Sequence, residues 1–265
     1  MILNSILKYP RTKHIEGSRC QPGDENLDSV PFSKISNKFI VVEEKVDGAN
    51  CGISFRDDGE LLLQSRGHYL TGGGREKHFN LFKTWANAHS SELFDILEDR
   101  FIMYGEWLYA KHTVFYDNLP HYFMEFDIWD KVEGKFLSTE RRREMLKDFP
   151  FVVSVLVLFE GKLNTLKALT DFLGRSNFIS DQAGEKLRKI CNEKGLSFEQ
   201  VVKETDLNNL MEGLYIKVEE DGEVKERYKY VRASFLTSIL NSESHWLERP
   251  IIPNVLKDEV DLYKV

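Results

Sequence analysis

The chain has 265 residues, of which 42% are hydrophobic and 30% charged, a composition that is typical of a globular protein and excludes disordered and collagen-like chains. Its formal net charge is −7 at pH 7, which argues against a protein that coats nucleic acid through bulk positive charge. The longest apolar run, residues 151–159, is far shorter than the ~20 residues that cross a bilayer, and residues 1–10 lack the order of regions of a secretory signal. We therefore expect a cytoplasmic protein without membrane contact.

Strand and helix signals alternate in the first half of the chain. Residues 38–45, 51–55 and 60–66 predict three antiparallel strands, the last two joined across the turn signal Asp57-Asp58-Gly59. Apolar residues at roughly helical spacing predict one or two helices over residues 79–97. The aromatic and aliphatic segments 100–107 and 122–129 predict two central strands.

The second half changes character twice. Residues 164–210 are predicted to be helical, with caps at Asn164 and Ser180, Gly195 past the second helix and a capping box from Ser197 to Gln200. Residues 213–219 and 224–231 then predict a hairpin. No repeat or linker divides the chain, so we predict a single α+β domain over residues 1–265, with a helical insertion at about residues 160–210 and a short C-terminal tail at residues 233–265.

The tetrapeptide Lys45-Val46-Asp47-Gly48 places a lysine at the end of a predicted strand, just before a turn. A lysine acts as a nucleophile only after its ammonium loses a proton, which requires burial or nearby positive charge to lower its pKa. A surface lysine before an ordinary turn is the plainer interpretation, and about one chain in twenty of this length contains such a tetrapeptide by chance. The motif alone is only suggestive.

Five further segments follow this lysine in an order that separate explanations do not account for. They are Gln64-Ser65-Arg66-Gly67, Tyr104-Gly105-Glu106-Trp107, Glu125-Phe126-Asp127-Ile128, Glu212-Gly213-Leu214-Tyr215-Ile216-Lys217 and Lys229-Tyr230-Val231-Arg232. Each alone is typical of a strand end, a core aromatic residue or a solvated hairpin. Together they supply the cations that phosphoryl transfer needs around the phosphate oxygens, with carboxylates and an aromatic ring beside them.

These segments resemble the motifs of the covalent lysyl-nucleotidyltransferase superfamily, which comprises ATP-dependent DNA and RNA ligases and mRNA capping enzymes. K-V-D-G-A-N, Y-G-E-W, E-F-D-I and E-G-L-Y-I-K are most similar to the ATP-dependent RNA ligase family, in particular its RNA ligase 2-like group, from about Lys38 to Arg232. The resemblance implies an antiparallel sheet-rich nucleotidyltransferase domain, an ATP-grasp-like ligase adenylation domain. Only 33 residues follow Arg232, too few for the C-terminal oligonucleotide-binding (OB) barrel of DNA ligases and capping enzymes.

The resemblance implies roles for five residues in the first half of the chain. Lys45 would attack the α-phosphate of ATP, release pyrophosphate and carry AMP as a phosphoramidate. Arg66 would contact the ribose and the phosphate of the 5′ end, Glu106 would hold the ribose hydroxyls, and Phe126 would stack on adenine. Asp47 would lie beside the lysine and the metal ion.

The resemblance also implies roles for three residues near the end of the matched region. Glu212 would bind Mg²⁺ or Mn²⁺ through its water shell, while Lys217 and Lys229 would neutralise the α-phosphate and, with the metal, lower the pKa of Lys45. The family usually carries K-x-K in its last motif, whereas here Arg227 and Arg232 flank Lys229. Either arginine is a candidate for the missing lysine.

The resemblance predicts an enzyme that self-adenylates on Lys45, transfers AMP to an RNA 5′-phosphate and seals it to a 3′-hydroxyl, with ATP and Mg²⁺ or Mn²⁺ as cofactors. Its partners would be RNA ends and, for end repair, other subunits, and either the helical insertion or such a subunit would grip the RNA. A DNA or nicked-hybrid ligase is the alternative within the superfamily. A non-catalytic end-binding subunit of a repair complex is the alternative from another class.

Other motifs receive plainer interpretations. Gly72-Gly73-Gly74 lacks the G-K-[ST] of a phosphate loop and is predicted to be a flexible connection, and the histidines lack metal-ligand spacing. His14 and Arg19 are candidates for approaching the nucleotide from the N-terminal side. The three cysteines are too widely spaced for a zinc site and are predicted to be reduced thiols, and residues 141–143 are predicted to be a solvated helix face.

Overall fold

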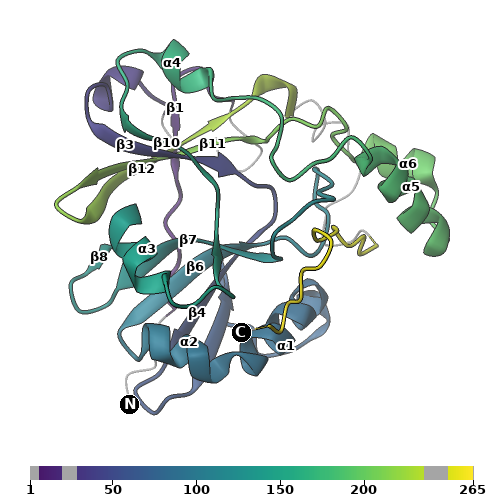
Figure 1. Cartoon of the computed structure of the whole chain (residues 1–265), viewed down its shortest axis with the longest axis horizontal. Helices are drawn as coiled ribbons and strands as arrows, with labels where there is room; N and C mark the ends of the chain where they lie inside the picture. Colours follow the sequence, from purple (N-terminus) through teal and green to yellow (C-terminus); the bar gives the residue numbers. More distant parts are fainter. Residues whose placement is uncertain (1–5, 20–28, 236–249, 265) are drawn as a thin grey trace.

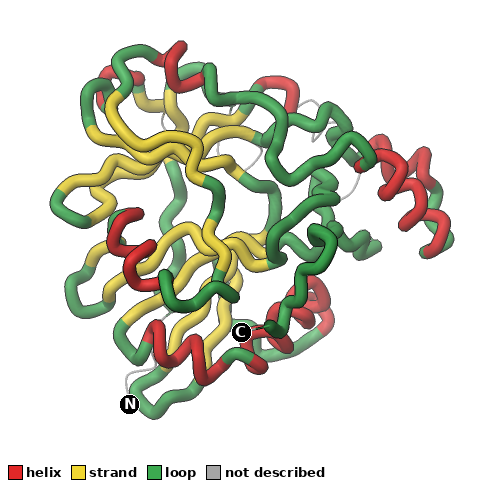
Figure 2. The backbone as a smooth tube through the Cα atoms, viewed as in Figure 1, coloured by secondary structure: helices red, strands yellow, loops and turns green. Residues whose placement is uncertain are grey.

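The structure, a computed structural model, describes residues 6–19, 29–235 and 250–264. Its strands form two sheets, which lie as an upper and a lower layer in Figures 1 and 2. The first sheet has the order β10 (Val157–Lys162), β3 (Phe39–Lys45), β11 (Gly213–Glu220), β12 (Glu223–Val231), β1 (Lys13–Ile15) and β2 (Ser29–Val30). The second has the order β5 (Leu61–Ser65), β4 (Ala49–Phe55), β6 (Phe101–Trp107), β7 (Phe123–Asp130) and β8 (Lys135–Phe136), with β9 (Val153–Ser154) beside β7. The predicted antiparallel sheet-rich α+β fold is confirmed.

Helices cover the outer faces of the two layers. The described helices are η1 (Phe32–Lys34), η2 (Gly74–Phe79), α1 (Asn80–Ala88), α2 (Ser90–Leu97), α3 (Thr139–Leu146), α4 (Leu166–Thr170), α5 (Ala183–Glu193) and α6 (Phe198–Lys203). In Figure 1, α1 and α2 lie below the second sheet, α4 lies above the first, and α5 and α6 project to one side. The inner faces of the two sheets are thereby left facing each other.

The path of the chain between β3 and β4 differs from the prediction. We expected residues 38–45, 51–55 and 60–66 to form one antiparallel group, but only β4 and β5 pair with each other. β3 instead pairs with β11 and β10 in the other sheet. The short turn after Lys45 therefore carries the chain from one sheet to the other, and β10, which the sequence did not predict as a strand, supplies the second neighbour of β3.

The predicted helical insertion begins later than expected and is capped differently. Residues 157–162 are strand β10, and the helices α4, α5 and α6 occupy parts of residues 166–203. Thr165, not Asn164, caps α4 by accepting from the N–H of Ala168. Ser180 is not the cap of α5, because the helix begins at Ala183 and Gln182 occupies the cap position. Ser197 caps α6 as predicted, by accepting from the N–H of Gln200.

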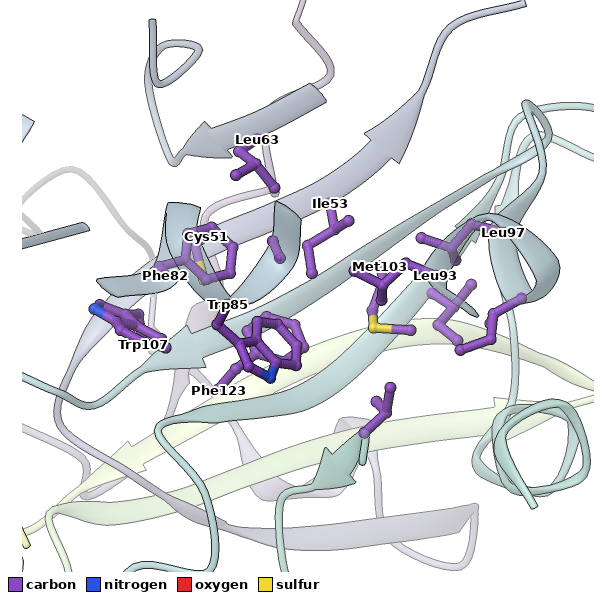
Figure 3. Packing of buried hydrophobic residues seen from close by; sticks show 14 of the residues in the cluster. Cys51, Ile53, Leu63, Phe82, Trp85, Leu93, Leu97, Met103, Trp107 and Phe123 are labelled. Carbon is purple, nitrogen blue, oxygen red and sulfur yellow. The ribbon is translucent and has the colours of Figure 1, made fainter. Parts of the chain in front are cut away.

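The largest core lies between the second sheet and helices α1 and α2 (Figure 3). Phe82 and Trp85 of α1 are fully buried, and both rings stack on Phe123 of β7, with centroid distances of 5.7 and 5.3 Å. A second core packs η1 and α4 on the outer face of the first sheet. Burial of such large aromatic side chains is the main favourable term that holds each layer to its helices.

The cluster of arginines at residues 141–143 is only partly a solvated face. Arg141 is half-buried and pairs with Glu133, and Arg143 is exposed and pairs with Glu160. Arg142, in contrast, is 2% exposed, and its guanidinium pairs with Glu125 of β7 at 2.7 Å and Glu43 of β3 at 3.1 Å. The prediction is therefore wrong for Arg142, because one side of α3 faces the space between the sheets, where two buried carboxylates require a cation.

The cysteines were predicted to be reduced thiols, and no segment was predicted to cross a membrane. Cys51 and Cys191 are buried and free, and burial raises the pKa of both thiols, as expected for unreactive side chains. Cys20 lies outside the described residues. None of the helices in the described ranges combines the length and apolarity that crossing a bilayer requires.

The buried side chain of His121 is expected to make the protein less stable as the pH falls below neutral. It is 4% exposed, its ring lies 5.0 Å from that of Trp85, and burial lowers its pKa from 6.5 to about 4. The unfolded chain therefore binds more protons than the native protein between these pKa values, and stability is lost as the pH falls through this window. Between pH 7 and 5 we expect this group alone to lower the free energy of unfolding by about 2 kcal/mol.

Urea unfolding at pH 7 and pH 5 checks this expectation. His121→Gln should lose about 2 kcal/mol less than the wild type between the two pH values. His68, which is exposed, gives the matched control, and His68→Gln should keep the wild-type pH dependence. A His121→Gln protein that loses as much stability as the wild type would contradict the assignment.

Candidate active site

A cavity of about 280 Å³ lies between the inner faces of the two sheets. Five residues that the sequence singled out line it, and they come from four strands and one strand end: Lys45, Arg66, Glu106, Phe126 and Lys229. Its wall also includes Tyr9, Arg11 and Thr12 from the N-terminal segment, together with Glu43, Glu44, Val46, Asn50, Val155 and Tyr215. The cavity therefore brings together residues that are as much as 220 positions apart in the sequence.

Lys45 ends β3 at the wall of this cavity. Its side chain is 22% exposed, and Nζ lies 2.6 Å from Oε2 of Glu212, whose side chain is 2% exposed. Burial lowers the pKa of the Lys45 ammonium, but the carboxylates of Glu212, Glu106 and Asp47 together raise it above its ordinary value. We expected a lowered pKa from neighbouring cations, and the direction is opposite because carboxylates surround the amine.

A glycine makes the close approach of strands possible beside Lys45. Gly213 of β11 lies directly opposite Lys45 in the antiparallel ladder. A Cβ atom at this position would lie 1.9 Å from the carbonyl oxygen of Tyr230 on β12, far inside van der Waals contact. Gly213 is therefore required for the packing of β11 against β12, and it directly follows Glu212, the partner of Lys45.

Asp47 faces away from the cavity wall. Its carboxylate oxygen Oδ2 accepts hydrogen bonds from the backbone N–H groups of Thr113 at 2.7 Å and Val114 at 2.9 Å. Its own N–H donates to the hydroxyl of Tyr116 at 2.8 Å. The expected place beside Lys45 is supported only by charge, since Asp47 contributes to the raised pKa of Lys45. Its contacts are those of a residue that fixes the turn.

Glu106 lies on β6 and lines the same cavity as Lys45. The carboxylate accepts a hydrogen bond from the N–H of Gly48 at 3.2 Å. Burial raises the pKa of Glu106 to about 7, and the positive charges of Lys45 and Arg66 only partly oppose this effect. At neutral pH this carboxyl group can therefore both accept and donate hydrogen bonds, which suits contact with hydroxyl groups.

Asn50 is a wall residue to which the sequence analysis gave no role. It lies opposite Glu106 in the β4–β6 ladder, and its Oδ1 is buried without a hydrogen-bond partner among the described residues. A buried carbonyl oxygen without a partner is costly, so it indicates a group that another molecule satisfies. Its position at the end of K-V-D-G-A-N was the signal that could have identified it.

Aromatic residues line another part of the cavity wall. The rings of Phe126 and Tyr215 have centroids 6.4 Å apart, and the ring of Tyr9 meets Phe126 edge-on at 5.0 Å. Hydroxyl groups hold these tyrosines in place, because Thr12 bonds to Tyr215 at 2.9 Å, Tyr215 to Tyr9 at 2.6 Å, and Tyr9 donates to Asp127 at 2.5 Å. The result is an aromatic part of the wall, and a base can stack on the face of an aromatic ring.

Lys217 is placed differently from the expectation. It is fully buried, and Nζ pairs with Glu43 at 2.9 Å and Asp127 at 3.3 Å and donates to the carbonyl of Phe126. Lys217 is not among the residues that line the cavity. Alternation does put it on the same face of β11 as Tyr215, but two residues farther along, between the sheets. The α-phosphate role of Lys217 therefore stays a prediction, which these contacts do not support.

The candidates for the missing lysine also lie away from the cavity wall. Arg227, on the same face of β12 as Lys229, pairs with Asp127 at 2.9 Å and covers the ring of Phe136. Arg232 pairs with Asp206, near the helical insertion. Neither lines the cavity, whereas Arg11, which the sequence analysis did not consider, does.

The two N-terminal candidates are not at the wall either. His14 is fully buried, and its Nδ1 lies 2.7 Å from the hydroxyl of Ser18. Arg19 is exposed, and its backbone N–H donates to the carbonyl of Val231. The N-terminal segment does reach the cavity, but through Tyr9, Arg11 and Thr12.

The oxygen atoms near Lys45 suit a hard divalent cation. Within the described ranges, no group of three or more His, Cys, Asp or Glu side chains is arranged to hold a metal ion directly. Glu106, Glu212 and the unpartnered Oδ1 of Asn50 nevertheless supply oxygens of the kind that Mg²⁺ and Mn²⁺ prefer. The residues present fit a cation that keeps much of its water shell.

Comparison of the sequence with models of known protein families assigns the chain to a family. The sequence model of the RNA ligase family matches residues 38–231, most of the chain and every residue discussed above from Lys45 to Lys229. The chain belongs to the RNA ligase family. The matched region contains the second sheet and four strands of the first, β3, β10, β11 and β12, but not β1, β2 or the wall residues Tyr9, Arg11 and Thr12.

Solved structures of an RNA ligase from Naegleria gruberi share the fold. A variant with ATP and Mn has a TM-score of 0.56 and 16% identity, and the match covers 88% of this chain and 58% of that one. The enzyme with PPi (TM-score 0.54, 17%) and a variant with AMP and Mn (TM-score 0.53, 15%) each match 89% of this chain and 59% of theirs. This family member thus spans a little more than half the length of these ligases. No curated protein sequence matches it.

Proposed function

We propose that this chain is an ATP-dependent RNA ligase that becomes adenylated on Lys45, transfers the AMP to an RNA 5′-phosphate and joins that end to a 3′-hydroxyl. The observation that carries the proposal is the single cavity lined by Lys45, Arg66, Glu106, Phe126 and Lys229. A nucleophile, two further cations, a carboxyl group that bonds hydroxyls and an aromatic ring are the groups that attack on a nucleotide phosphate requires. The family assignment supports the same activity.

The first step requires the neutral amine of Lys45. Its nitrogen attacks the α-phosphorus of ATP, the N–P bond forms, the bond from the α-phosphorus to the bridging oxygen breaks, and pyrophosphate leaves with that electron pair. The amine proton is lost before or during attack, and Glu212, 2.6 Å from Nζ, is the nearest carboxylate. Mg²⁺ or Mn²⁺, held by Glu212 through water, would supply positive charge that offsets the carboxylates around Lys45.

The other wall residues position the nucleotide. Phe126 would contact the adenine ring, and Glu106 the ribose hydroxyls, for which its pKa near 7 is suited. Lys229 would neutralise the α-phosphate, and Arg66 would contact the ribose and the arriving 5′-phosphate through its planar fork. Asn50 and Tyr215 belong in this set on position alone.

In the later steps the AMP serves as a leaving group. An oxygen of the RNA 5′-phosphate attacks the adenylate phosphorus, the N–P bond breaks, and Lys45 is regenerated. The 3′-hydroxyl then attacks the 5′-phosphorus, loses its proton and displaces AMP, which is a far better leaving group than a phosphate oxygen. The Naegleria gruberi structures with ATP and Mn, with PPi, and with AMP and Mn support the use of these reagents here.

A labelling experiment tests the proposal. Purified protein freed of bound AMP with pyrophosphate is incubated with α-labelled ATP and Mg²⁺ or Mn²⁺ and run on a denaturing gel, and we expect one labelled protein band. The labelled protein is then given RNA, DNA or nicked RNA–DNA substrates with 5′-phosphates and 3′-hydroxyls, and we expect sealing of RNA. An unlabelled protein would favour the end-binding subunit, and sealing of DNA alone would favour a DNA ligase. The cytoplasmic location and the repair partners stay predictions.

A further inference from the structure

One loop holds the turn that follows Lys45 through hydrogen bonds. This loop, residues 108–119, connects β6 to β7, and it makes three hydrogen bonds to Asp47: two from backbone N–H groups to the carboxylate and one from the Asp47 N–H to the hydroxyl of Tyr116. Because Asp47 is two residues from Lys45, the loop helps to fix the end of β3 at the cavity, together with the pairing of Lys45 and Gly213.

Several backbone N–H and C=O groups of this loop form hydrogen bonds with another segment of the chain. Its polar groups bond to the C-terminal tail, residues 250–264: the N–H of Lys111 donates to Ile252, that of Val255 to the carbonyl of Tyr116, and that of Lys257 to Leu119, at 2.8–2.9 Å. Two isolated β-bridges link the same segments, Ala110 with Pro253 and Leu119 with Leu256. In Figure 1 this part of the tail runs in yellow beside the teal loop. The tail thus acts as a strand-like support.

Asn254 is the central residue of this support. It is 1% exposed, its Oδ1 accepts from the N–H of Tyr116 at 2.9 Å, and its Nδ2 donates to the carbonyl of Leu108 at 2.7 Å. Its backbone carbonyl accepts from the hydroxyl of Tyr122 at 2.8 Å. The side chain therefore joins both ends of the segment from Leu108 to Tyr116, a role that needs one acceptor and one donor at once.

We propose that Tyr116, held by Asn254 of the C-terminal tail, is a positioning residue that keeps Lys45 aligned for attack. The path runs from Asn254 to the backbone of Tyr116, through its ring to the hydroxyl, and from there to the Asp47 N–H. Tyr116 is fully buried and does not line the cavity, so it acts only through the turn. Asn254 lies outside the family match. The proposal rests on the function proposed for Lys45.

Tyr116→Phe removes one oxygen atom and tests the proposal. The ring, its packing and the bonds of its backbone to the tail are kept, while the Asp47 N–H loses its partner. We measure single-turnover adenylation with α-labelled ATP over a range of ATP concentrations. The expected result is a rate constant at saturating ATP lowered by about tenfold or more, with half-saturation changed less than about threefold, because alignment and not binding is lost.

Tyr122→Phe is the matched control. It also deletes a tyrosine hydroxyl that bonds to the tail, but this hydroxyl reaches Asn254 and not Asp47. Its rate constant should fall by less than about threefold, because Asn254 keeps both of its side-chain bonds to the loop. Asn254→Ala should lower the rate constant in the same direction as Tyr116→Phe, since it releases the backbone of Tyr116.

The amplitude of the same reaction separates positioning from folding. A merely structural role would reduce the labelled fraction of the protein and leave the rate constant of that fraction unchanged. A rate constant for Tyr116→Phe within about twofold of the wild type, with the wild type labelled normally, overturns the positioning role and leaves the proposed function intact. A wild type without label would instead refute the proposed function itself.

Discussion

Lys45→Arg is expected to abolish transfer of label from ATP to the protein, a loss of about 10⁴-fold or more. Arginine keeps a positive charge opposite Glu212, so the buried carboxylate keeps a cation partner and the fold is expected to persist. A guanidinium is not deprotonated near neutral pH, so it offers no nucleophilic nitrogen. Alanine would remove the nucleophile as well, but it would also leave Glu212, 2% exposed, without its ion pair. Label on the denatured protein, followed over time, checks the result.

Two controls accompany this variant. Lys38→Arg makes the same substitution just before the opposite end of β3, at a lysine that is 42% exposed, and should label at the wild-type rate. The Lys45→Arg protein should still seal an RNA strand that is supplied already adenylated at its 5′ end, because that step needs no bond to residue 45. Wild-type labelling of Lys45→Arg would show that another group carries the AMP.

Asp127→Asn is expected to lower the free energy of unfolding by about 3–5 kcal/mol. Asp127 is fully buried between Lys217 at 3.3 Å and Arg227 at 2.9 Å, and it also accepts from Tyr9. Burial alone would raise its pKa, but the two cations outweigh burial and lower the pKa to about 2. Asparagine keeps the shape but removes the carboxylate that pairs with Arg227, and it leaves Lys217 with Glu43 as its carboxylate partner among the described residues, so the cost is that of a broken ion pair in a low dielectric.

Denaturant unfolding at neutral pH measures the effect. Asp171→Asn gives the matched control, since Asp171 pairs with Lys167 on the surface at 61% exposure and its loss should cost less than about 0.5 kcal/mol. The stabilisation from Asp127 is complete above pH about 3.8 and is lost as the pH falls toward 2, so the difference between the two proteins should shrink there. A neutral-pH cost for Asp127→Asn as small as that of the control would contradict a buried charged network.

Much of the cavity was predictable because the residues that line it lie in short motifs that resemble those of a known family. Glu106, Phe126 and Lys229 were identified from short segments, and each lies on the wall. Lys217 shows the limit of this reasoning, because a motif does not tell how far along a strand the cavity wall extends, and two residues move a side chain about 7 Å. Arg142 shows another limit, since a basic run on a helix has no signal for the buried carboxylates that face one of its members.

Other parts of the site depend on pairings between distant segments. The N-terminal residues Tyr9, Arg11 and Thr12 reach the cavity because the strand that follows them, β1, pairs in parallel with β12. No local pattern marks a three-residue parallel strand. The separation of β3 from β4 was missed for a similar reason: both segments read as strands, and only the partners of β3, which are β10 and β11, determine the sheet to which it belongs.

The contact between Gly213 and Tyr230 limits how this site can change by mutation. Since there is no room opposite Lys45 for a single methyl group, even alanine would act as a wedge between β11 and β12. The wedge would shift Lys229, which sits next to Tyr230, relative to Lys45. Substitutions that change the reaction are therefore expected at wall residues that have space around their side chains. Gly213 is expected to remain glycine.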